Sequence, residues 1–143
     1  GLFSSELPAK QMAVFCRQLA ATYTAGIPIA QSLDVVGAQM ANKRVRTLTA
    51  EMKEDILRGS TLAGAAAAQS KRLPLFFVQL VSAGERSGRL DAMLRDLGKY
   101  YEDKVALQRT IMMSMLYPGI QLGFAWFAGS FALTTVNRIS TTA

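Results

Sequence analysis

The sequence contains no histidine and a single cysteine, Cys16, among its 143 residues. Structural zinc sites are built from cysteine and histidine ligands, and many catalytic pairs join a nucleophile to a histidine base. These absences exclude a Cys/His metal site and a Cys/His catalytic pair. Cys16 itself falls on an apolar helical stripe, where we expect a packed core thiol.

Motifs for other kinds of catalysis are missing too. The sequence has no glycine-rich phosphate loop leading into a helix with lysine, no Ser/Lys arrangement and no carboxylate pair that would define a cleft. We therefore predict that the protein is not an enzyme and has no catalytic, cofactor-binding or metal-binding residues.

Charge is scarce at 18% of residues, and it is absent between Arg109 and Arg138. Residues 120–136, IQLGFAWFAGSFALTTV, are almost wholly apolar or small. A helix needs about 20 apolar residues to cross a bilayer, and the run reaches that length when extended back to Ile111. We predict a transmembrane helix over 111–137. The alternative is a buried helix of a soluble bundle; the position near the C-terminus argues against a cleaved signal peptide.

The formal net charge is +6, and every Lys and Arg except Arg138 precedes the apolar run. Lys99, Lys104 and Arg109 lie close to the span, which favours a cytoplasmic N-terminal domain. Cations elsewhere are interleaved with acids, as between Glu51 and Arg58, so a solvated surface explains them better than nucleic-acid binding does.

Apolar residues recur with helical spacing, and no stretch shows the alternation of a strand. The first helix is predicted from Pro8 to Ala25. Gly26 then accepts a left-handed backbone, and Pro28 opens a second helix. The apolar face of the first helix comprises Met12, Phe15, Cys16, Leu19, Ala20 and Tyr23.

Four further helices follow in the prediction. Asn42 caps the third, which Gly59 ends. Ser60 caps a short fourth helix through the AGAAAA tract, and Pro74 begins a fifth. That fifth helix is expected to form the centre of the bundle through Phe76, Phe77, Leu80 and Val81. After the GERSG loop, a sixth helix runs into the span. The fold class is all-α: a six-helix bundle over 1–110, the membrane helix over 111–137 and a short tail over 138–143.

Four motifs occur in order between residues 12 and 118: FCRQLA, AGIPI, AGERSGRLD and MLYP. Together they resemble the type II secretion system F family, which includes general secretion pathway F proteins and PilC-type pilus platform proteins. The resemblance implies a cytoplasmic six-helix bundle followed by a membrane helix, in a protein whose complete form repeats the domain and adds two spans. Such a chain is expected to be a fragment comprising the first half.

The resemblance also implies a role and partners. It implies an inner-membrane platform that couples a cytoplasmic secretion or pilus ATPase to the assembly of pilin-like subunits. Expected partners are this ATPase, other inner-membrane secretion or pilus proteins, pilin-like subunits, the membrane and further copies in a homo-oligomer, without nucleic acid. The competing hypotheses are a membrane-tethered dimerisation or adaptor module outside secretion, and a small transporter or channel subunit.

The motif residues receive local roles. Arg17 and Gln18 follow Cys16 off the apolar face, and we expect Arg17 to pair with Glu85 or Asp91 or to anchor a partner. Glu85 and Asp91 are expected to cap the sixth helix. Gly84 and Gly88 are expected to adopt backbone angles that a Cβ forbids, which permits a tight turn. The remaining motif positions, Tyr117 and Pro118, mark a bend at membrane entry.

Some family members hold calcium at a dimer contact, and the corresponding positions are Gln31, Glu85 and Arg89. Arg89 brings a positive charge where calcium needs oxygen, so we predict no metal. Met112, Met113 and Met115 are interpreted as gap-filling apolar residues rather than a peptide groove.

Overall fold

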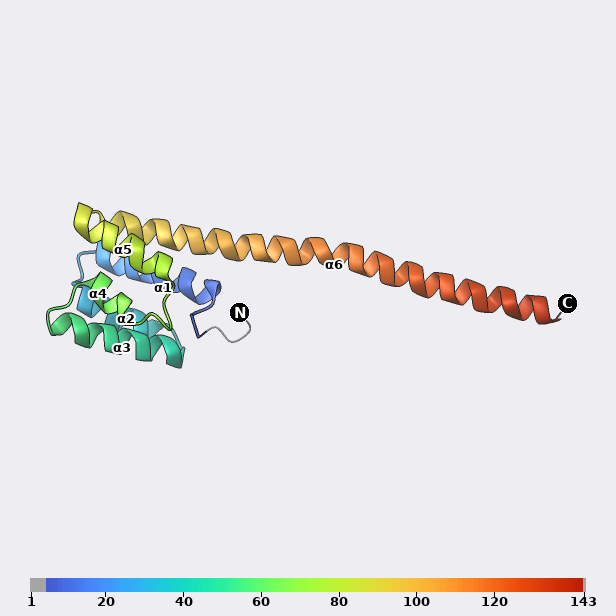
Figure 1. Ribbon diagram of the computed structural model, residues 1–143, viewed down its shortest axis with the longest axis horizontal. Helices are drawn as coiled ribbons and strands as arrows, with labels where there is room; N and C mark the ends of the chain where they lie inside the picture. Colours follow the sequence, from blue (N-terminus) through green and yellow to red (C-terminus); the bar gives the residue numbers. More distant parts are fainter. Residues whose placement is uncertain (1–4, 143) are drawn as a thin grey trace. The chain divides into compact units, whose positions relative to one another are not determined.

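The computed structural model describes residues 5–142, although it does not describe the side chain of Thr142. Within these residues every regular element is an α-helix, and there are six of them (Figure 1). Their bounds are α1 Ala9–Thr24, α2 Ile29–Gln39, α3 Lys43–Leu57, α4 Leu62–Ala67, α5 Leu75–Ser87 and α6 Leu90–Thr142. The all-α, six-helix prediction is confirmed. Residues 1–4 and 143, at the ends of the predicted domain and tail, lie outside the described residues.

The chain forms two compact units, one up to Val105 and one from Ala106 onward. The first contains α1 to α5 and the beginning of α6, and in it α2 packs on α3, α1 on α2, α3 on α4 and α4 on α5. The second is the remainder of α6. Residues 138–142 of the predicted tail continue this helix.

The core of the first unit follows the predicted helical faces. Met12, Phe15, Cys16 and Leu19 of α1 are fully buried, and Phe15 packs against Phe77 of α5 with ring centroids 5.9 Å apart. These residues share one face of α1 because they recur every three or four positions. Other helices contribute Leu33, Val36, Val45, Leu48, Met52, Val81, Leu94 and Leu97, all fully buried.

The central position predicted for α5 is only partly correct. Phe77 and Val81 are buried, but Phe76 is 38% exposed and Leu80 is half-buried. The ring of Phe76 packs instead on that of Tyr100, with centroids 4.6 Å apart. An apolar run on a helix of a small bundle still has a side that faces away from the core.

Helix ends agree with the sequence prediction at three positions. Asn42 caps α3, since its side-chain oxygen accepts hydrogen bonds from the N–H groups of Arg44 and Val45. Gly26 and Gly59 adopt positive φ angles of 91° and 105°. The predicted cap Ser60 is wrong: the adjacent Thr61 caps α4 by accepting a hydrogen bond from the N–H of Gly64.

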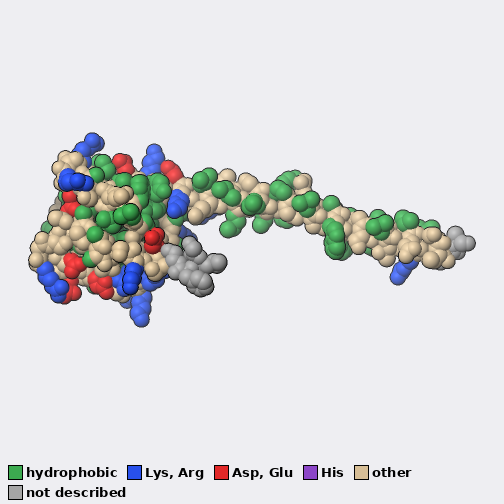
Figure 2. Space-filling view, viewed as in Figure 1, with side chains coloured by type: hydrophobic (Ala, Val, Ile, Leu, Met, Phe, Trp, Pro, Cys, Tyr) green, Lys and Arg blue, Asp and Glu red, His purple; other side chains and the backbone are tan. Residues whose placement is uncertain are grey.

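The second unit has the composition of a membrane helix. In the space-filling view, hydrophobic side chains follow this stretch whereas charged side chains gather over the bundle (Figure 2). Its large apolar side chains are exposed, among them Phe124, Trp126, Phe127, Phe131 and Leu133. By length and composition α6 can cross a membrane, and none of its most apolar part is buried within the chain. Within the described residues this segment is not buried, whereas the buried-core alternative expects it to be.

Candidate functional site

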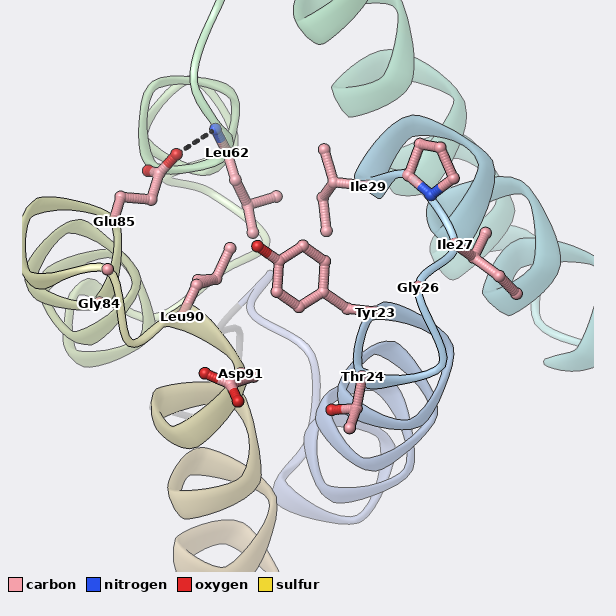
Figure 3. Close-up of a pocket in the computed structure, with 12 residues that line it drawn as sticks. Tyr23, Thr24, Gly26, Ile27, Ile29, Leu62, Gly84, Glu85, Leu90 and Asp91 are labelled. Carbon is pink, nitrogen blue, oxygen red and sulfur yellow. Dashed lines mark hydrogen bonds between the residues drawn. The ribbon is translucent and has the colours of Figure 1, made fainter.

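A cleft of about 650 Å³ opens between the α1–α2 turn and the α5–α6 turn (Figure 3). It brings together motif residues that are far apart in the sequence: Gly26, Pro28, Gly84, Glu85, Gly88 and Asp91. Tyr23, Ile29, Leu62 and Leu90 complete much of its apolar lining. The cleft is thus the place where two of the sequence motifs meet.

The α1–α2 turn forms one wall. Gly26 has φ 91°, a backbone conformation that residues with a Cβ rarely adopt. Pro28, predicted to open α2, is its N-cap, so the helix begins one residue later than predicted, at Ile29. The Pro28 carbonyl accepts the hydrogen bond from the Ser32 N–H at 2.8 Å. The fixed φ of proline suits this position because no N–H is needed there.

Glu85 lies within α5 and caps a helix that the sequence did not indicate. One carboxylate oxygen accepts a hydrogen bond from the backbone N–H of Leu62 at 3.1 Å (Figure 3), and the other accepts one from the N–H of Ala63 at 2.7 Å. These N–H groups belong to the first turn of α4, where no intrahelical acceptor exists. The prediction that Glu85 caps the sixth helix is wrong, because α5 continues through the GERS residues and directs this side chain toward α4.

The two glycines of the GERSG motif, Gly84 and Gly88, have different structural roles. Gly88 has φ 70° and ends α5 in the left-handed conformation, as predicted. Gly84 is an ordinary helical residue, so the prediction of an unusual backbone angle is wrong there. Its hydrogen allows close packing: a Cβ would lie 2.9 Å from Met93 Cγ and 3.0 Å from Leu90 Cα. Gly84 therefore permits α6 to approach α5 directly after the turn.

Asp91 occupies the first turn of α6 rather than the cap position. The carbonyl of Arg89 accepts from the Met93 N–H at 3.0 Å, so the helix already begins ahead of Asp91. The Asp91 carboxylate lies 3.7 Å from the guanidinium of Arg95, one turn further along. An acid in the first turn still interacts favourably with the helix dipole.

Arg17 contacts neither Glu85 nor Asp91. Its guanidinium pairs with Glu102 of α6 at 2.5 Å, and its side chain is 72% exposed. The predicted partners are wrong because α1 and α6 pack with Gly98 against the backbone of Arg17, which brings a later turn of α6 to this arginine. The Oε1 atom of the neighbouring Gln18 is buried and has no hydrogen-bond partner among the described residues.

The core contains two ionisable groups, the Cys16 thiol and the Tyr101 hydroxyl, that burial keeps neutral. Burial raises the pKa of the Cys16 thiol far above its ordinary value, because the thiolate would lose its hydration. Burial likewise raises the pKa of the Tyr101 hydroxyl, and the neighbouring Cys16 adds to this effect. A thiol in this state is a poor nucleophile, in agreement with the packed role expected for Cys16.

Tyr117 and Pro118 lie in the other unit, within α6. Tyr117 is exposed, and the helix is continuous through Pro118. Neither residue is among those that line the cleft. The bend expected at Pro118 stays a prediction.

The calcium-site positions do not fit a cation. Both oxygens of Glu85 already accept hydrogen bonds from backbone N–H groups, and Arg89 carries a positive charge. Calcium requires six to eight oxygen ligands, and within residues 5–142 no group of three or more acidic, histidine or cysteine side chains is placed to bind a metal. Glu85 and Arg89 therefore do not offer the oxygen ligands that calcium needs.

Some important contacts were not anticipated from the sequence. Glu51 accepts hydrogen bonds from Gln69 at 2.7 Å and from Arg72 at 2.8 Å, which joins α3 to the segment after α4. These hydrogen bonds lower the pKa of Glu51, that from Gln69 most. Such long-range pairs have no fixed spacing in the sequence, so only the folded chain reveals them.

Comparison with known proteins places the motifs in a family. Residues 15–136 match the family described as type II secretion system (T2SS), protein F. The chain belongs to this family. It is similar to the type IV pilus assembly protein PilC of Myxococcus xanthus, with 37% identity over 109 residues that cover 76% of this chain and 26% of that protein.

Two further relatives of the T2SS protein F family show the same relationship. The type II secretion system protein F of Pseudomonas aeruginosa is 30% identical over 141 residues, covering 96% of this chain and 35% of that protein. The PilC protein of Thermus thermophilus is 33% identical over 127 residues, covering 89% of this chain and 31% of that protein. The chain thus spans about a third or less of the length of these relatives.

Proposed function

We propose that this chain forms part of an inner-membrane platform in a type II secretion or type IV pilus machine. The supporting observation is the family match over 15–136, which includes both the helical bundle and the membrane-capable helix. The named relatives are divided between pilus assembly and type II secretion, and the motifs of this chain do not favour one machine over the other.

In this proposal the bundle, residues 1–110, lies in the cytoplasm and residues 111–137 cross the membrane. The cations Lys99, Lys104 and Arg109 precede the span, and positive residues favour the cytoplasmic side. The platform would couple a cytoplasmic ATPase to the assembly of pilin-like subunits and would associate with further copies of itself. It would act as a scaffold and not as an enzyme.

The motif residues support this role by shaping the bundle. Glu85 holds α5 to α4, Gly84 brings α6 close to α5, and Gly26 with Pro28 turns α1 into α2. A protein that transmits force between partners needs a rigid arrangement of its helices. We propose that the cleft motifs are maintained for this rigidity, and that Arg17 on the exposed side of α1 is available to a partner.

A deletion and pull-down experiment tests the proposal. Cells lacking the gene should lose pili or secreted proteins, and the complete protein in detergent should retain the ATPase of the same machine. An Arg17→Ala variant that folds normally should retain less of it. Normal piliation and secretion in the deletion strain, with no ATPase recovered, would favour the adaptor hypothesis instead.

A further inference from the structure

A second depression of about 650 Å³ lies between the exposed sides of α1 and α6. It is lined by Arg17, Ala20, Ala21, Thr24, Arg95, Gly98, Lys99, Glu102 and Asp103, all from the first compact unit. We call it the α1–α6 groove. It is separate from the cleft described above, with which it shares only Thr24.

Small residues form the centre of the groove. Ala20 and Ala21 come from α1, and Gly98, which packs against the backbone of Arg17, comes from α6, so these three positions add no long side chain to the lining. The lining extends from Arg17 to Thr24 on α1, which is about 10 Å at 1.5 Å per residue. Helices with small contact residues approach each other closely, at axial separations of about 8 Å. The groove therefore has the length of about two turns of a third helix.

The charges around the groove are not evenly distributed. Arg95 and Lys99 lie one helical turn apart on α6, whereas Glu102 and Asp103 lie at the following turn. Arg17 neutralises Glu102 through the 2.5 Å ion pair. One end of the groove is thus cationic, and Asp103 makes the other end acidic.

The two cations are available to a ligand. Arg95 has only a loose, exposed pair with Asp91 at 3.7 Å, and no hydrogen bond or ion pair within residues 5–142 involves the ammonium group of Lys99. Exposed pairs of this kind contribute little to folding stability. Complementary charges at a binding surface instead set which partner binds and in which direction.

We propose that the α1–α6 groove binds an acidic helix of a partner protein. That helix carries two carboxylates one turn apart, which face Arg95 and Lys99, and a small residue between them that rests on Ala21. A neutral or basic residue at its other end faces Asp103, which fixes the direction of binding. A second acid at that end would be repelled. This inference does not depend on which machine the protein serves.

A binding measurement with designed peptides tests the groove directly. The probe is a fluorescent, alanine-rich helical peptide with two glutamates one turn apart and a lysine one turn further, titrated onto the full chain in lipid nanodiscs. We expect saturable binding that weakens as salt is raised, because exposed charges are screened over about 8 Å at physiological ionic strength. A peptide with every charge reversed should not bind.

Three variants separate the groove from general attraction to a basic protein. Arg95→Glu with Lys99→Glu should weaken binding at least tenfold, and Ala21→Trp should do the same by filling the groove without changing charge. The matched control, Lys43→Glu with Arg46→Glu on α3, changes the net charge of the protein by the same amount. It should leave binding unchanged. Circular dichroism checks that each variant is folded.

Several results would overturn the proposal. These are no saturable binding of the acidic peptide, equal binding of the charge-reversed peptide, or equal loss in the α3 control and the groove variants. The platform proposal fails separately, through normal pili and secretion in the deletion strain. The two conclusions can therefore be distinguished.

Discussion

Glu85 of α5 is joined to Ala63 of α4 by a hydrogen bond of 2.7 Å from the Ala63 N–H to the carboxylate. The other carboxylate oxygen accepts from the Leu62 N–H. A single side chain thus satisfies two N–H groups at the start of a six-residue helix that is too short to be stable alone. This contact links the GERSG motif to the alanine-rich segment.

Replacement of Glu85 by alanine should destabilise the bundle. The change leaves two part-buried N–H groups without their acceptors, and such a loss costs about 1–3 kcal/mol. Glu85→Gln should cost less because one side-chain oxygen remains. Thermal unfolding of the full chain in detergent, followed by near-ultraviolet circular dichroism, measures both. Equal stability of wild type and Glu85→Ala would contradict the capping role.

Gly84→Ala should destabilise the protein through overpacking. The new Cβ would lie 3.0 Å from the backbone at Leu90, which cannot rotate away, and overpacking typically costs about 1–3 kcal/mol. Denaturant unfolding measures the effect. Shortening Met93 to alanine in the same chain should restore little of the loss. Full rescue by Met93→Ala would show that only the flexible side chain was in the way.

Arg17→Ala should have almost no effect on stability. Both partners of the Arg17–Glu102 pair are substantially exposed, and such pairs contribute about 0–1 kcal/mol. Chemical denaturation should therefore give a free energy of unfolding close to that of wild type. Loss of partner binding in this stable variant would assign Arg17 to an interface, whereas a large fall in stability would show that the ion pair is structural.

Acid should destabilise the α3 contact through Glu51. Its pKa in the folded chain lies below the ordinary value because Gln69 and Arg72 donate hydrogen bonds to the carboxylate. The unfolded chain therefore binds the proton more readily, so this contribution is present at neutral pH. It is lost as the pH falls below about 4.5 through the folded pKa.

Unfolding measured between pH 7 and pH 3 checks this linkage. Glu51→Gln should lower stability at pH 7 and reduce the further loss on acidification. Gln69→Leu removes the strongest of the hydrogen bonds to Glu51 and should produce a smaller change in the same direction. An unchanged pH dependence in Glu51→Gln would show that other carboxylates govern the acid response.

Cys16 should resist thiol reagents in the folded protein. It is fully buried and burial raises its pKa, so both access and the reactive thiolate are lacking. Alkylation by iodoacetamide at pH 8, followed by mass spectrometry, should be slow in the native chain and fast in denaturant. Rapid native labelling would indicate that α1 opens readily from the bundle.

Helical periodicity, the uncharged C-terminal run and the family motifs could all be recognised in the linear sequence. The spacing on α1, the Asn42 cap and the left-handed positions of Gly26, Gly59 and Gly88 each depend on neighbours within a few residues. Local backbone geometry favours these features whether or not the helices have packed together. The order of helices and the membrane-capable segment were therefore determined by the sequence itself.

Only the tertiary structure decided which distant groups meet. Glu85 lies beside α4 and not at the start of α6, and Arg17 lies beside Glu102 and not Glu85. Both outcomes depend on where one helix crosses another, which small residues such as Gly84 and Gly98 control by allowing close approach. Contacts between helices carry no fixed sequence spacing, because they result from the packing of all the side chains together.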